Sequence, residues 1–267
     1  MDLETWRAIE SETERINVFY KNCDEDIRLN ASKARRVEFI TTVKYVEKYL
    51  SPGNKIMDIG PGAGEYSLYF AKQGYLVTAV ELVDDNVAAF RAKITPDLDI
   101  DLRQGNACDL SAFSDNSFDV VLLMGPLYHI SDPADRQKCI DEARRVCKPG
   151  GVIFFAYISS DMVVLTETFR YDLNYLIHGD YNHETFQIDS IIPFVLVTVA
   201  DARDELVNAG IKLLHEIAVD GVSELLEEKI NQLDDAGYAQ YLRYHFYCCE
   251  KPEMLGRSNH LLFVGQN

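Results

Sequence analysis

The 267-residue sequence is poor in basic residues for its size. It has 26 Lys and Arg against 43 Asp and Glu, so its formal net charge is −17 at pH 7. Proteins that bind nucleic acids neutralise phosphates with clusters of Lys and Arg. The densest such cluster here is the short segment 33–36, which is typical of a solvated helix face. A nucleic-acid partner is therefore disfavoured, although folding could still assemble a local basic patch.

Long apolar runs and paired cysteine motifs are absent as well. No apolar segment reaches the length of a membrane span, and the first 20 residues carry too many charges for a signal peptide. The six cysteines have neither metal-ligand nor disulfide-framework spacing. Cys139 and Cys147 are expected to pack as small core residues. We expect a reduced, cytoplasmic protein with no metal and no membrane partner, whose oligomeric state the sequence leaves open.

The sequence does have a regular alternation of strand and helix patterns between residues 55 and 158. This alternation is typical of a parallel sheet covered on both faces, and the length fits one α/β domain with an appended cap. The aromatic-rich segment that follows breaks the rhythm just past the fifth strand, where inserts stand over a ligand crevice. We expect one domain, 1–267, that comprises a helical N-terminal cap (1–50), a cofactor-binding core (51–158), a cap insert (159–198) and the C-terminal part of the sheet (199–267).

A glycine-rich turn lies at residues 60–64, directly after an apolar strand. Gly60, Gly62 and Gly64 have no Cβ atoms, so the backbone can turn tightly and lie against a ligand. The predicted helix from Glu65 points its free N–H groups back at this turn. Glu81 ends the next strand, where it can accept hydrogen bonds from the two hydroxyls of a ribose. The pattern predicts a cofactor that contains a nucleoside.

The spacing of the turn discriminates between such cofactors. The dinucleotide pattern requires a third glycine at position 65, which is Glu65 in this chain. An acidic side chain there would repel a pyrophosphate, which weighs against the alternative of a nicotinamide-dependent oxidoreductase. Asp58, two residues before the first glycine, is a second carboxylate at the mouth of the turn. The two acids favour a ligand with an ammonium or sulfonium group.

The segment 58–64 followed by Glu81 resembles motif I and the acidic residue after it in class I S-adenosylmethionine-dependent methyltransferases. Residues 105–109, 118–124 and 144–151 resemble later motifs of this family in the same order. The resemblance covers about residues 36–265. It implies a Rossmann-like, doubly wound sheet of seven strands, mostly parallel with an antiparallel last strand, with helices on both faces. It also implies S-adenosylmethionine as the cofactor.

The resemblance assigns roles in cofactor binding to individual residues. Those expected around the methionine part, the ribose and the adenine are Asp58, Gly60, Gly62, Gly64, Glu81, Leu82, Asn106, Ala107, Met124 and Gly125. The N-terminal segment would add Tyr20 and Arg28 as lid contacts, since Arg can pair with the carboxylate of the cofactor. The alternative for both is a surface or helix-packing role.

Methyl transfer is an in-line displacement, in which the protein chiefly aligns the reactants and excludes water. A general base is optional. His129, after the fourth strand, is the best candidate because a neutral imidazole titrates near working pH; its alternative is a structural histidine. Gly125 and Leu127 depart from the Asp or Asn, proline, proline and aromatic pattern of methyltransferases that modify exocyclic base nitrogens. This departure argues against base methylation.

The sequence therefore predicts methyl transfer from S-adenosylmethionine to an O or N atom of a small-molecule acceptor. Two alternatives stay open. An acidic surface could recruit basic protein segments, as in a protein methyltransferase, and the cofactor-binding residues would also suit a non-catalytic S-adenosylmethionine-binding protein. A closed aromatic cavity beside the sulfonium would indicate a small molecule, and an open groove would indicate a macromolecule.

Overall fold

The computed structural model describes residue 9 and residues 11–22, 27–188, 190–191 and 193–267. The predicted N-terminal helical segment is described only in part, and Trp6 lies outside the described residues. Its described elements are α2 (Glu12–Lys21), the short helix η1 (Arg28–Asn30) and α3 (Lys33–Glu47). Ser11 and Ser32 cap α2 and α3 by accepting hydrogen bonds from backbone N–H groups in the first turn.

The sheet has the predicted arrangement, with an antiparallel last strand. The parallel strands lie in the order β3, β2, β1, β4, β5. The last strand, β9, pairs antiparallel with β5 on one side and with β8 on the other. These strands are β1 (Lys55–Ile59), β2 (Leu76–Glu81), β3 (Ile100–Gln104), β4 (Phe118–Leu123), β5 (Cys147–Ser159), β8 (Lys212–Ala218) and β9 (His260–Gln266).

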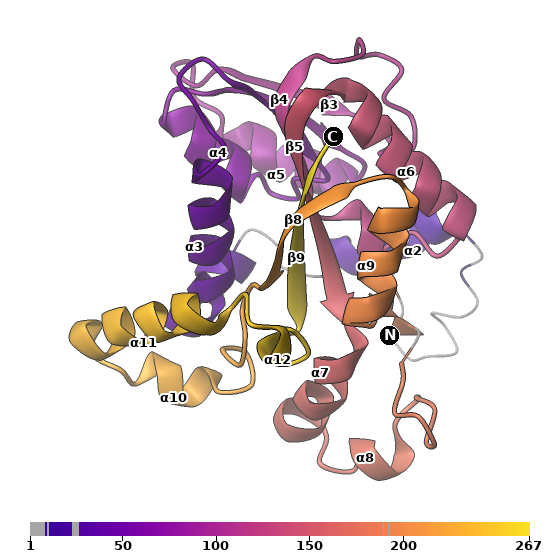
Figure 1. Ribbon diagram of the computed structural model, residues 1–267, viewed down its shortest axis with the longest axis vertical. Coiled ribbons are helices and arrows are strands. Elements are labelled where there is room, and N and C mark those ends of the chain that lie inside the picture. The colour runs from indigo at the N-terminus through magenta and orange to yellow at the C-terminus, as the bar shows by residue number, and fades with distance from the viewer. Residues whose placement is uncertain (1–8, 10, 23–26, 189, 192) are drawn as a thin grey trace.

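Helices cover both faces of this sheet, with α3 and α4 on one side and α6 and α9 on the other (Figure 1). Successive strand residues point to opposite faces. In β4, Val120 and Leu122 pack in the cluster with α3 and α4, whereas Val121 and Leu123 pack in the cluster with α6 and α9. The α-helices that follow α3 outside the cap insert are α4 (Glu65–Lys72), α5 (Asp84–Lys93), α6 (Pro133–Val146), α9 (Val199–Asn208), α10 (Glu227–Asn231), α11 (Asp235–Cys248) and α12 (Pro252–Leu255).

The described sheet has nine strands, two more than the resemblance implied. The cap insert supplies both, as the hairpin β6 (Ser190–Ile191) and β7 (Phe194–Val197). β7 pairs with the far end of β5, where Ile158 lies opposite Leu196. This is feasible because β5 continues to Ser159, beyond the ends of its other parallel partners. Between β5 and β6 lie α7 (Ser160–Thr166), the π-helix η3 (Glu167–Tyr171) and α8 (Tyr175–His178).

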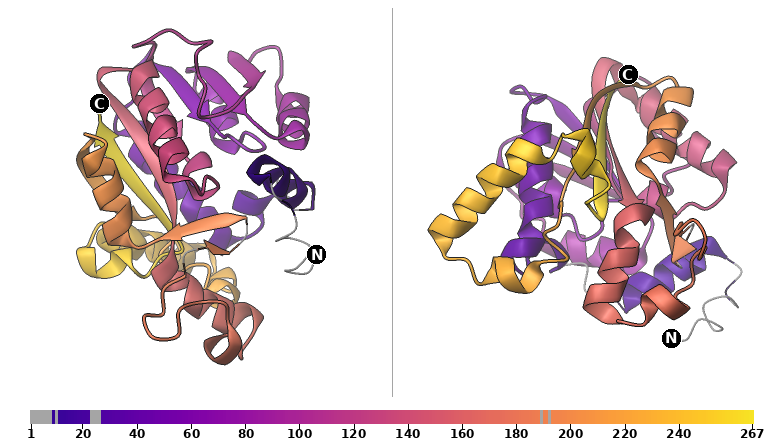
Figure 2. Two further views of the ribbon diagram at one scale, coloured as in Figure 1. Left: turned by 90° about the vertical axis from the view of Figure 1, so that its right-hand side faces the viewer. Right: turned by 60° about the horizontal axis from the view of Figure 1, so that its bottom comes forward.

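The insert extends past the carboxyl end of β5, and α2 lies beside its hairpin (Figures 1 and 2). The contact between them is aromatic: the ring of Phe19 packs edge-on against that of Phe194 at 4.9 Å. Segments far apart in the sequence thus close over the same edge of the sheet. This edge holds the carboxyl ends of the parallel strands, where open α/β sheets bind their ligands.

The cysteines behave as the sequence predicts within the described part of the chain. The five described cysteines are free thiols, and Cys139 on α6 and Cys147 at the start of β5 are buried in the core. Among the described residues, no helix is both long and apolar enough to cross a bilayer.

A buried ionic cluster ties the start of β9 to α3. Nδ1 of His260 donates to Asp220 at 2.8 Å and lies 3.7 Å from a carboxylate oxygen of Glu38. Burial opposes the charge on His260, but these two carboxylates outweigh it and raise the pKa of His260 to about 9. The imidazole is therefore a cation in the folded protein at neutral pH.

This cluster makes stability fall at alkaline pH. The folded-state pKa of His260 is above its ordinary value of 6.5, so its stabilisation is complete below about pH 6.5 and is lost as the pH rises through about 9. We expect the difference in free energy of unfolding between the wild type and His260→Gln to shrink by about 3 kcal/mol over this range. Urea titrations between pH 6 and pH 10 measure it, and a constant difference would contradict the assignment.

Candidate active site

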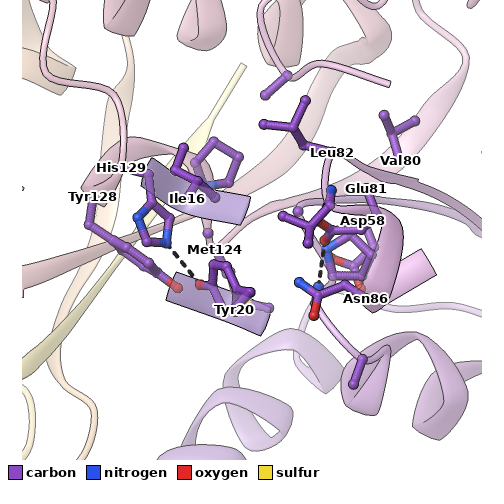
Figure 3. A pocket seen from close by; sticks show the side chains of 18 of the residues that line it. Ile16, Tyr20, Asp58, Val80, Glu81, Leu82, Asn86, Met124, Tyr128 and His129 are labelled. Atoms are coloured by element: carbon purple, nitrogen blue, oxygen red, sulfur yellow. Dashed lines mark hydrogen bonds between the residues drawn. The ribbon is translucent and has the colours of Figure 1, made fainter. Parts of the chain in front are cut away.

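A cavity of about 950 Å³, part of it open to solvent, lies at the carboxyl ends of β1, β2 and β4 (Figure 3). Helix α2 contributes Ile16 and Tyr20 to its wall. Of the residues that the sequence predicts for cofactor binding and catalysis, all but Gly64 line this cavity. The structure therefore brings together side chains from positions 20 to 129.

The glycine turn forms the floor of the cavity and needs its glycines. Gly60, Gly62 and Gly64 have φ values of 73°, 56° and 85°, in the left-handed region that other residues rarely adopt. A Cβ on Gly60 would also lie 2.8 Å from the ring of Pro126. A Cβ on Gly64 would lie 2.3 Å from the ring of Phe90. Gly64 thus acts behind the turn, where α4 packs against α5, and not in the cavity wall.

Two buried carboxylates define the polar side of the cavity. Glu81 accepts hydrogen bonds from the backbone N–H groups of Gly62 at 2.9 Å and Val83 at 2.8 Å. Asp58 accepts one from the hydroxyl of Ser67 at 2.6 Å. Burial raises the pKa of both acids, and that of Asp58 reaches about 7. Two desolvated carboxylates favour a ligand that brings hydroxyl groups and a cation.

The shape of the cavity fits a nucleoside with such groups. A Cβ on Gly125 would lie 2.8 Å from the carbonyl oxygen of Gly60. At these two glycines the wall of the cavity therefore consists of backbone atoms alone. Leu82, Asn106 and Ala107 line the cavity near the ends of β2 and β3. The side chain of Asn106 accepts from the N–H of Cys108 at 2.8 Å, which fixes the turn that carries these residues.

His129 and Tyr20 form a hydrogen-bonded pair in the wall of this cavity (Figure 3). Nδ1 of His129 lies 3.3 Å from the carbonyl oxygen of Pro193, which can only accept, so Nδ1 carries the proton. Nε2 therefore accepts from the hydroxyl of Tyr20 at 2.8 Å. Burial lowers the pKa of His129 to about 4, and the imidazole is neutral at physiological pH.

A buried network holds the segment that carries His129. The guanidinium of Arg136 donates to the carbonyl oxygen of Leu127 at 2.6 Å and pairs with both oxygens of Glu205 at 2.7 Å. The hydroxyl of Tyr157 donates to the same carboxylate at 2.7 Å. This network anchors the short helix η2 (Pro126–Tyr128) to α6, α9 and β5, and so orients the pair of Tyr20 and His129.

Comparisons with known proteins agree with this geometry. Residues 57–155 match the family described as a methyltransferase domain. The chain is similar to the ubiquinone biosynthesis O-methyltransferases of Stutzerimonas stutzeri, with 33% identity over 119 residues, and Azotobacter vinelandii, with 32% identity. These alignments cover 44% of this chain and 50% of each relative, so the chain spans about half the length of the curated relatives it matches.

Solved structures show the same fold over most of the chain. A SAM-dependent methyltransferase from Methanosarcina mazei has a TM-score of 0.55 and 21% identity, covering 84% of this chain and 96% of its own. The (4+2)-cyclase SpnF has a TM-score of 0.55 and 17% identity, covering 86% and 81%.

Residues 57–155 form a methyltransferase domain. This agrees with the glycine turn, with the carboxylates at 58 and 81, and with the order of motifs in the sequence. The resemblance that the sequence suggested is confirmed, as is its Rossmann-like fold.

The predicted lid residue Arg28 has a different partner from the one expected. Its guanidinium pairs with both oxygens of Glu38, at 2.8 and 3.3 Å. It nevertheless lines the methyltransferase cavity together with Tyr20. Contact with a cofactor carboxylate stays a prediction for Arg28.

Sequence reasoning missed several lining residues. Asn86, in the first turn of α5, is buried and its side chain hydrogen-bonds to Glu81. A polar residue on the buried face of that first turn, five positions after the acid, was the available signal. Tyr66 stacks on Phe39 of α3 at 5.1 Å and closes the cavity from the α4 side. Tyr66 follows Glu65 in the predicted helix, and no feature of the sequence distinguishes it from a core residue.

A second cavity, of about 1400 Å³ including its open part, adjoins the first. The two cavities share three lining residues, Tyr20, Arg28 and Tyr128. The rest of the second cavity comes mainly from the cap insert, with further residues from the N-terminal segment and from the start of β9.

Replacement of Glu81 tests the assignment of the cofactor cavity. We expect Glu81→Gln to weaken binding of S-adenosylmethionine by about 10- to 100-fold, because a neutral amide replaces a charged acceptor for the ribose hydroxyls. Isothermal calorimetry measures the affinity. Asp85→Asn is the control, since it removes an exposed carboxylate from the neighbouring helix α5, and equal effects of the two variants would refute the assignment.

Proposed function

We propose that this protein transfers a methyl group from S-adenosylmethionine to an O or N atom of a small-molecule acceptor. The observation that carries the proposal is the junction of the two cavities at Tyr20 and Tyr128. One cavity has the glycine turn and carboxylates suited to the methyl donor. The other opens from the same two tyrosines and has room for an acceptor under the cap. A donor and an acceptor bound in these cavities would meet at the junction.

The residues of the first cavity hold and orient the donor. When bound, S-adenosylmethionine supplies a methyl group that its sulfonium centre activates. Glu81 would accept from the ribose hydroxyls, the turn at Gly60 and Gly62 would lie against the methionine part, and Asp58 would pair with its ammonium group. Alignment in a cavity shielded by α2 is the main contribution to rate.

Tyr20 and His129 provide a path for the proton of the acceptor. As the acceptor atom attacks, its proton moves to the hydroxyl oxygen of Tyr20, while Tyr20 gives its own proton to Nε2 of His129. The hydrogen bond of 2.8 Å between them is already in place. Because the pKa of His129 is about 4, the imidazole is neutral and able to accept at working pH. His129 is thus the base, and Tyr20 is the group that contacts the acceptor.

A small molecule is the proposed partner for two further reasons. The net charge of −17 opposes nucleic-acid binding, and the cap places aromatic side chains around the second cavity. A cytoplasmic location stays a prediction from the sequence. A protein acceptor and a non-catalytic role are the competing hypotheses, and the fold alone does not decide between them.

An assay with methyl-labelled S-adenosylmethionine separates these hypotheses. The protein is incubated with a cell extract that has been divided into low-molecular-mass and protein fractions. We expect label to enter the low-molecular-mass fraction. Label in the protein fraction alone would indicate a protein methyltransferase. Cofactor binding without any transfer would indicate a non-catalytic protein.

Removal of one hydroxyl tests the proton path. We expect Tyr20→Phe to lower kcat about 100-fold, the usual contribution of general base catalysis, with little change in cofactor affinity. The kcat of the wild type should stay constant from about pH 8 to about pH 5.5, since a base with a pKa of about 4 is already neutral throughout.

Tyr69→Phe is the matched control. Its hydroxyl bonds to Glu47 on the surface, and Tyr69 lines neither cavity. An unchanged kcat in Tyr20→Phe, or a rate that halves near pH 6.5 as for an ordinary histidine, would contradict the path.

A further inference from the structure

The second cavity has mostly aromatic and aliphatic walls. Its rings come from three separate segments: α2, the segment after β4 and the cap insert. The lining side chains of this kind are Phe19, Tyr20, Tyr128, Ile158, Val163, Tyr171, Phe194 and Leu196. Such walls suit an apolar body, and the faces of the rings also attract cations.

The cationic side chains in this cavity are already neutralised by carboxylates. Arg28 pairs with Glu38 at 2.8 Å, Arg35 with Glu224 at 2.9 Å, and His260 with Asp220 at 2.8 Å. Arg35 also lies 3.4 Å from Glu227, which in turn pairs with Arg170 at 2.6 Å. An anionic ligand would have to compete with these acids for each cation. The cavity therefore offers little to a carboxylate or phosphate.

Glu167 is the exception among the acids that line the cavity. It is the first residue of the π-helix η3, and its half-buried side chain forms no ion pair or hydrogen bond within the described part of the chain. Burial raises the pKa of Glu167, and the neighbouring charge of Glu224 raises it further. Burial thus removes water from this carboxylate, and no ion pair with a described residue offsets the cost. A cationic ligand would offset it.

We propose that the acceptor is an organic cation, with an apolar body that packs against the rings of the second cavity and a protonated amine that pairs with Glu167. This rests on the function proposed above and names its substrate class. Glu167 lines only the second cavity, whereas Tyr20 and Tyr128 line both. The amine therefore binds away from the junction, and a separate O or N atom of the same molecule receives the methyl group.

Binding of three matched phenols tests the charge preference independently of methyl transfer. Tyramine carries an ammonium group, 4-ethylphenol is its neutral analogue, and 3-(4-hydroxyphenyl)propionate carries a carboxylate. Their affinities are measured by calorimetry on protein saturated with S-adenosylhomocysteine. We expect tyramine to bind about tenfold more tightly than 4-ethylphenol, the usual value of a charged hydrogen bond, and the propionate to bind most weakly.

Variants assign this preference to one side chain. Glu167→Gln should remove the tenfold preference for tyramine, and Glu167→Asp should keep part of it. Glu184→Gln is the control, because it removes an exposed carboxylate from the same insert, outside the cavity. Thermal unfolding of each variant confirms that the cap is intact.

The proposal is overturned if the wild type binds tyramine no better than 4-ethylphenol, if it binds none of the three compounds, or if Glu167→Gln keeps the preference. Failure of methyl transfer with a preserved preference for cations would instead contradict only the proposed function. Transfer to an acceptor without a cationic group, at rates that Glu167→Gln leaves unchanged, would support the function and overturn the substrate class.

Discussion

The turn between β1 and α4 is the constraint on which the rest of the site depends. Three glycines with positive φ values bring bare backbone to the end of the sheet, and Glu81 accepts the N–H of Gly62 from the neighbouring strand. A Cβ on Gly125 would lie 2.8 Å from the carbonyl oxygen of Gly60, and a Cβ on Gly60 would lie 2.8 Å from the ring of Pro126, so neither position has room for a side chain. The end of β1, the end of β2 and the segment after β4 are thereby held together.

The chemistry of the site is linked to the core by buried polar contacts. Arg136 and Glu205 hold the carbonyl of Leu127, and this fixes the segment that carries His129. Removal of one partner would leave an uncompensated buried charge, which costs about 3 to 5 kcal/mol. Helix α2 is joined to this part of the site by the contacts of Tyr20 with His129 and of Phe19 with Phe194, and by the carboxylate of Glu12, which accepts from the N–H of Ser131.

The sequence predicts the cofactor half of the molecule well and the acceptor half poorly, for a physical reason. The glycine turn, Asp58 and Glu81 are local features whose geometry depends on neighbouring residues and on the pairing of adjacent parallel strands. The contact of Tyr20 with His129 and the place of Glu167 depend on how α2 and the cap insert fold back over the sheet. Such contacts join residues more than a hundred positions apart, as for Tyr20 and His129, and no local pattern encodes them. The two extra strands of the cap escaped prediction because they are short and carry no clear alternation.

Calorimetric titration of S-adenosylmethionine into the wild type and Gly62→Arg tests the central claim most directly. We expect one site per chain in the wild type. We expect no measurable binding in Gly62→Arg, because the arginine side chain would fill the cavity at a position that also requires a left-handed backbone. Thermal unfolding shows whether the variant is folded. No binding to the wild type, or equal binding to a folded Gly62→Arg, would contradict the assignment of this turn as the cofactor site.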